Sequence, residues 1–384
     1  MKKITRMATL GVLLLTGATG TAFANGTSAP EPEPVRYMPP PPAAAAAPAP
    51  APAGLKFGGD ASVRVRNESY FGDWADTKED DMVFQYRVRL KAAADLGDGY
   101  FFKALLTNDN NGAGWNSVGY ANEEDYALEV SNFYFGRMQE NCHWMVGRLP
   151  LNSFNNPIFD ITLYPSQPLG TPVFNIHMNR IYGMNYGHKL GDGMLNTTLV
   201  VLDNESGDNT SLEGDGLFND GYALHLSYKV NVGDVTLEPQ FLTVLTNGDV
   251  SLGYDVTPYT FGAMIGVPAG DAKLGFGAFY TNCDDATPNG GPDVDYDGYL
   301  FRVKGEIGNF MAWYDYNRTT DDVTDIKYTN HFVWAQYKIP VYSSAAGSVT
   351  IQPTLRYLAS KEDYGSYDTK GERLRSELWA TVTF

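Results

Sequence analysis

The chain has 384 residues, a formal net charge of −17, two Cys and five His. This acidity argues against nucleic-acid binding, which leaves a basic footprint, and the few Cys and His argue against a disulfide scaffold or a Cys/His zinc module. A mean hydropathy of −0.28 excludes a bundle of membrane helices. With 25 Tyr and 40 Gly, the composition favours an all-β protein.

Residues 1–24 have the pattern of a secretory signal. Lys2, Lys3 and Arg6 precede an apolar run over Met7–Leu15, and Ala22-Phe23-Ala24 forms a cleavage site. The apolar run is too short for the roughly 20 residues that a membrane-spanning helix needs. We therefore predict export with a cleaved signal, which leaves a mature net charge of −17 − 3 = −20.

Residues 25–54 form a Pro/Ala-rich periplasmic linker. They hold ten of the 22 prolines, and such a segment favours extended polyproline II over a packed core. The sequence is compatible with a plain spacer or with a docking arm, and no residue favours the arm.

Apolar and polar residues alternate from Leu55 to Phe384, as in Arg87-Val88-Arg89-Leu90-Lys91-Ala92. Alternation predicts strands with one apolar and one polar face. About sixteen such runs are expected, at 55–66, 82–96, 100–107, 127–137, 141–149, 179–188, 193–203, 220–231, 234–245, 254–266, 271–282, 297–306, 309–318, 326–338, 347–359 and 372–384.

The connections between these runs alternate in length. Short Gly/Asp turns, such as those at 96–99 and 190–193, have hairpin chemistry. The other set is mostly long and acidic: 67–81, 107–126, 150–178, 204–219, 283–296 and 360–371. Short turns confined to one end are not typical of a β-sandwich. An outer-membrane barrel has them, with short periplasmic turns at one end and long external loops at the other. The predicted fold class is therefore a transmembrane antiparallel β-barrel over 55–384.

The chain ends in Leu378-Trp379-Ala380-Thr381-Val382-Thr383-Phe384, a strand with alternate apolar residues and a terminal aromatic. With the signal, the strand number and the long third connection, this resembles the general diffusion porins of Gram-negative bacteria. The resemblance implies an outer-membrane location, lipid and lipopolysaccharide as surroundings, a homotrimer, and passive diffusion of small hydrophilic solutes. The proline-rich arm departs from the simplest porins.

Basic residues occupy the inward positions of three strands that neighbour one another in a closed barrel. Counting residues from the periplasmic strand ends places the six arginines of this set near one level. The hypothesis is a basic constriction wall, and the alternative is a solvated lumen face. The predicted wall consists of Arg64, Arg66, Arg87, Arg89, Lys91, Arg373 and Arg375.

The third connection, 150–178, is rich in apolar residues and Pro and carries one acid, Asp160. Such a loop is expected to fold into the lumen, as the third loop of porins does, and Asp160 would then face the basic wall. The alternative is packing outside the barrel or at a subunit contact.

Asp293, Asp295 and Asp297 resemble the first half of a calcium loop, but the twelfth position is Lys304 rather than Glu. Either an acidic turn or a calcium ion fits, and no other cofactor is expected.

Cys142 and Cys283 are predicted at opposite ends of the barrel, too far apart to form a disulfide. No histidine shows a catalytic or metal spacing, so an enzyme is not expected.

The sequence thus predicts a water-filled channel. The alternatives are a non-conducting structural barrel that links envelope layers, and a substrate-specific channel for phosphate-like anions or sugars.

Overall fold

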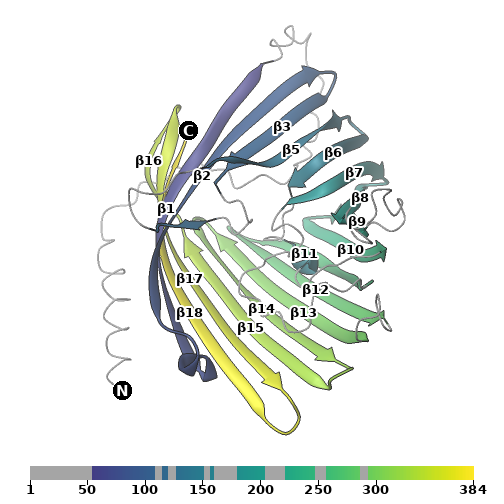
Figure 1. The fold of residues 1–384 in the computed structure, drawn as a ribbon. Coiled ribbons are helices and arrows are strands. Elements are labelled where there is room, and N and C mark those ends of the chain that lie inside the picture. Colours follow the sequence, from purple (N-terminus) through teal and green to yellow (C-terminus); the bar gives the residue numbers. More distant parts are fainter. Residues whose placement is uncertain are drawn as a thin grey trace, which may run out of the picture. The chain divides into compact units, whose positions relative to one another are not determined.

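Sixteen antiparallel strands close into one ring in the computed structural model, which describes residues 54–108, 115–119, 127–150, 156–159, 180–203, 221–246, 257–285 and 293–384. Each strand pairs with the next along the chain, and β1 closes the ring by pairing with β18 as well as with β2 (Figure 1). The all-β barrel with sixteen strands is therefore confirmed. Residues 1–53, which include the predicted signal and most of the linker, lie outside the described residues.

The strands of the ring agree with the predicted runs to within a few residues at the short-turn end. Their bounds are β1 Leu55–Gly72, β2 Asp81–Gly97, β3 Tyr100–Thr107, β5 Glu129–Met138, β6 Cys142–Pro150, β7 Arg180–Leu190, β8 Gly193–Asp203, β9 Gly221–Val232, β10 Val235–Thr246, β11 Tyr259–Ala269, β12 Ala272–Asp285, β13 Val294–Ile307, β14 Phe310–Asp321, β15 Ile326–Tyr337 with β16 Ile339–Ser344, β17 Gly347–Asp363 and β18 Asp368–Thr383.

Smaller elements complete the described chain. β15 and β16 are separated only by Lys338 and act as one strand of the ring, and β4 (Asn116–Ser117) adds a two-residue pairing to β2. Two 3-10 helices, η1 (Asp73–Asp76) and η2 (Pro157–Phe159), lie in the first and third long connections. Within the described part of the chain, no helix is long and apolar enough to cross a membrane.

The short turns gather at one end of the ring, as their Gly/Asp chemistry predicts. Between β2 and β3, Asp98 has a φ of 51° and is flanked by Gly97 and Gly99 at 86° and 80°. Three successive positive φ angles are costly for most residues but accessible to Gly and Asp. This end of the barrel is called the short-turn end below, and the other the long-loop end.

Two of the predicted long loops are shorter than expected, because strands extend into them. β1 runs on to Gly72, β17 runs on to Asp363 and β18 begins at Asp368, so the connections shrink to 73–80 and 364–367. Cross-strand ion pairs explain why charged residues stay in the sheet here: Glu68 pairs with Arg375, and Lys361 pairs with Asp368.

The barrel reverses the usual exposure of side chains. On β1, Val63 is 60% exposed and its neighbour Arg64 only 4%, and on β13 Phe301 and Val303 are 49% and 48% exposed while Arg302 between them is 1% exposed. Alternate positions of a strand point to opposite faces. The outer face of the barrel is therefore apolar, and the inner face holds the polar and charged residues together with a buried apolar cluster that includes Leu300, Trp313 and Phe332.

Candidate functional site

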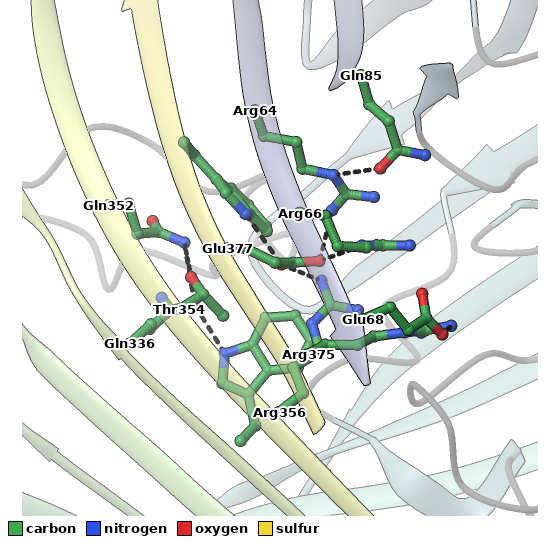
Figure 2. Close-up of polar contacts among 12 residues, drawn as sticks. Arg64, Arg66, Glu68, Gln85, Gln336, Gln352, Thr354, Arg356, Arg375 and Glu377 are labelled. Carbon is green, nitrogen blue, oxygen red and sulfur yellow. Dashed lines mark hydrogen bonds and ion pairs between the residues drawn. The ribbon is translucent and has the colours of Figure 1, made fainter. Parts of the chain in front are cut away.

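A buried carboxylate gathers three arginines on the inner face where β1, β17 and β18 meet (Figure 2). Glu377 Oε1 lies 2.6 Å from Arg66 Nε and 3.3 Å from an Arg64 terminal nitrogen, and its Oε2 accepts from Arg356 at 3.0 Å. The Glu377 side chain is 0% exposed. Three cations on one carboxylate give a site that is polar, ordered and positive.

Tryptophan rings stack against the guanidinium groups of these arginines. The Arg64 guanidinium lies 4.2 Å from the centre of Trp115, Arg87 lies 4.8 Å from the same ring, and Arg356 lies 3.8 Å from the Trp334 ring. Trp379 donates from Nε1 to Glu377 at 2.9 Å. Stacking on an aromatic face stabilises a guanidinium and limits its rotation.

Two further carboxylates pair with the remaining basic residues of this wall. Asp60 accepts from Arg89 at 2.9 and 3.0 Å and lies 3.8 Å from Lys91. Glu68 lies 2.8 Å from Arg375 and 3.7 Å from Arg373.

The register separates these groups along the barrel. Asp60 of β1 lies opposite Arg89 of β2, whereas Glu68 and Tyr70 of β1 lie opposite Arg375 and Arg373 of β18. From Asp60 to Tyr70 is 70 − 60 = 10 residues of β1, about 33 Å of strand at roughly 3.3 Å per residue.

The expectation that six arginines share one level is therefore wrong. β1 starts at Leu55 and first pairs in register with β18 at Asp60 and Thr383, so the ends of the two strands do not coincide. Gly59 and not Leu55 lies opposite Phe384, so counting from these two strand ends misplaces β1 against β18 by four residues (59 − 55 = 4). The basic residues form a column along the wall instead of a ring.

All seven basic residues predicted from the sequence lie on this inner wall. Alternation also points Glu377 inward, but it does not predict which arginines pair with this acid. We define the basic column as these seven plus Arg356, with the carboxylates Asp60, Glu68 and Glu377. Eight cations and three acids give 8 − 3 = +5. Arg356 could have been found, because it continues the inward series Gln352, Thr354 on its strand. The pairings between these acids and arginines could not have been found, since they depend on the register between strands.

Asp160 lies outside the described residues, as does most of the third connection. The described part, 156–159, meets the barrel wall at β10 and β11. Asn156 donates to Gln240 on the inner face of β10 at 2.6 Å, and Ile158 is fully buried. The inward fold of the whole loop and the role of Asp160 stay predictions.

The three aspartates of the possible calcium loop flank or lie in a strand. β13 begins at Val294 and pairs with β12, so Asp295 lies opposite Asp284 and Asp297 opposite Asn282. In the described ranges, no group of three or more His, Cys, Asp or Glu could hold a metal ion. The extended backbone does not favour a calcium loop here, because it spaces alternate side chains along the strand instead of around one point.

Another ion pair lies on the inner face outside the basic column. Arg302 of β13 donates to both carboxylate oxygens of Asp315 of β14, each at 2.6 Å. Both side chains are 1% exposed. Cys142 begins β6 at the short-turn end and Cys283 lies near the end of β12 at the long-loop end, so the two lie at opposite ends of the barrel, as predicted.

A closed sixteen-stranded antiparallel ring with an apolar outside and a charged inside defines a porin-like barrel. No protein-family model and no curated protein matches the sequence.

Solved structures share the fold at low sequence identity. Vibrio cholerae OmpT, an outer membrane protein folded in vitro, is 13% identical with a TM-score of 0.55, over 86% of this chain and 97% of that chain. The anion-selective porin of Comamonas acidovorans is 13% identical with a TM-score of 0.52, over 86% and 100%. OprB of Pseudomonas putida, at high pH, is 12% identical with a TM-score of 0.54, over 86% and 94%. At these identities the likeness is one of fold.

Proposed function

We propose that the protein is an outer-membrane porin, a water-filled channel through which small hydrophilic solutes and ions diffuse passively. The observation that supports this most is the reversed exposure: Val63 and Phe301 are exposed on the outside while Arg64 and Arg302 face inward. Arg at the lipid midplane costs roughly 2–4 kcal/mol on a barrel, so this surface suits hydrocarbon outside and water inside. A sixteen-stranded barrel is wide enough for an aqueous channel.

The sign of selectivity follows from the basic column. With eight cations and three acids along one wall, the potential inside the channel favours anions over cations. The acidic external segments, such as Asp321 and Asp322, act at the mouth, where salt screens them more strongly. We therefore expect a modest anion preference. The Comamonas acidovorans protein of similar fold is an anion-selective porin.

The proposal places the chain in the outer membrane, in contact with lipid and lipopolysaccharide, after export by the predicted signal. A homotrimer is part of it, since one solved structure of similar fold, Vibrio cholerae OmpT, is described in a trimer form. Crosslinking of the purified protein in mild detergent tests this part separately. The proposal involves no catalysis and no cofactor.

Planar bilayers test the channel directly. Purified, folded protein should produce discrete current steps in KCl, and in a salt gradient the reversal potential should have the sign of chloride preference. Folding is checked by heat-modifiable migration in gels. A silent bilayer with folded protein contradicts the proposal and supports the structural, envelope-linking barrel instead.

A further inference from the structure

The part of the basic column nearer the long-loop end carries +3 of its total charge of +5, and Arg87, Arg89 and Lys91 with Asp60 carry the other 3 − 1 = +2. We call the former part the upper arginine cluster: Arg64, Arg66, Arg356, Arg373 and Arg375, with Glu68 and Glu377. Five arginines and two carboxylates give 5 − 2 = +3 within adjacent register positions of β1, β17 and β18. The part around Asp60 holds Arg89 and Lys91 in direct contact with that acid.

Two features of the cluster leave its positive charge only partly offset. Arg356 and Arg375 are direct cross-strand partners, and like charges in such a pair repel each other. Arg64, Arg66 and Arg356 all share Glu377, so one negative charge serves three positive ones. An added anion at this place would relieve repulsion as well as gain hydrogen bonds.

The cluster separates into supporting and accessible arginines. Arg64 and Arg356 are 2% and 6% exposed at their side chains and are held by Glu377 and the tryptophans. Arg66, Arg373 and Arg375 keep 13%, 15% and 16% exposure toward the interior. Three accessible guanidinium groups on two neighbouring strands provide several N–H donors in fixed orientation. Arginine forks match the geometry of phosphate and carboxylate oxygens.

We propose that the upper arginine cluster is a saturable binding site for small oxyanions of at least two negative charges, such as inorganic phosphate, within the channel wall. This inference rests on the proposed channel function, since the anion reaches the site through the channel. The charge excess of the cluster favours a divalent anion over a monovalent one. Glu68 lies between Arg373 and Arg375 and competes for them, so binding is weak enough to permit release, which conduction requires.

Inorganic phosphate is the probe for the test. Single-channel chloride current is measured at a low ionic strength that is kept constant. Phosphate is added in millimolar steps to a buffer that contains no sulfate, and nitrate is added in the same way as the monovalent comparison. In the wild type, phosphate should reduce the chloride current with saturation, and nitrate should do so far less. Arg373→Gln and Arg375→Gln should weaken the apparent phosphate affinity about tenfold or more, because each removes charge-assisted bonds.

Lys91→Gln is the matched control, because it removes one cation of the basic column outside the cluster. It should lower chloride preference but leave the phosphate effect within about twofold. A phosphate effect absent from the wild type, unchanged in both arginine variants, or lost equally in Lys91→Gln overturns the site.

Failure of the site and failure of the channel are distinguishable. If the folded wild type conducts no current, the proposed function is wrong, and the site is then judged by calorimetric titration of phosphate into the detergent-solubilised barrel. Saturable heat that disappears in Arg375→Gln supports an oxyanion site without a channel, and no heat in the wild type overturns it.

Discussion

Arg302 and Asp315 form a two-pronged ion pair across β13 and β14, with both N–O distances at 2.6 Å and both side chains almost fully buried. Removing one member of a buried pair leaves the other charge without compensation, which costs about 3–5 kcal/mol. Asp315→Asn should therefore lower the free energy of unfolding by about this amount, measured by urea titration in lipid vesicles.

A double substitution separates pairing from packing at this place. Arg302→Met with Asp315→Leu should recover much of the loss, since it buries no charge. If the single variant unfolds at the same urea concentration as the wild type, the pair contributes nothing to stability.

Glu377→Gln should have two effects of opposite kind. It leaves Arg64, Arg66 and Arg356 without their shared carboxylate, so the barrel should lose about 3 kcal/mol of stability or more. It also raises the net charge of the basic column by one, so the reversal potential in a KCl gradient should move further toward chloride. Glu372→Gln, on the other face of the same strand, is the control and should leave the reversal potential unchanged. A shift toward potassium would contradict the assignment of Glu377 to the channel wall.

Phe301 tests which face meets lipid. It is exposed on the outer face in the middle of β13, so Phe301→Arg should cost about 2–4 kcal/mol in a bilayer. Phe301→Ala isolates the loss of the ring and should cost less. Equal stability of the two variants in vesicles would mean that this face lies in water.

Gly371 determines where the first external segment lies. A Cβ at Gly371 would stand 2.0 Å from Cδ2 of Trp74 in η1, and Lys78 lies 4.3 Å from the centre of the same ring. Gly371→Ala should therefore displace Trp74 and speed trypsin cleavage after Lys78 on intact cells. Gly305→Ala is the control, because its nearest atom would be Leu274 Cδ2 at 3.8 Å. Unchanged cleavage in Gly371→Ala would show that Trp74 does not pack there.

Alternation of residues was enough to predict the ring of strands and which face of each strand is polar, because both depend on local sequence. The level of the arginines was not predictable in this way. Gly59, four residues after Leu55, lies opposite Phe384, and that offset is a property of two strands more than 300 residues apart. The same long-range register brings Glu377 to Arg64 and Arg66. Trp115 was missed because it lies within the predicted connection 107–126, outside every predicted strand.

Four neighbouring positions of β2 test most directly which face of the barrel contacts lipid and which contacts water. Single cysteines at Val88, Arg89, Leu90 and Lys91, in a chain with Cys142 and Cys283 replaced by serine, are spin-labelled in lipid vesicles. Collision with oxygen reports lipid contact and collision with a nickel chelate reports water. We predict oxygen contact at 88 and 90 and nickel contact at 89 and 91. The reverse order, or nickel contact at all four positions, would contradict a barrel that turns its apolar face to lipid and its arginines to enclosed water.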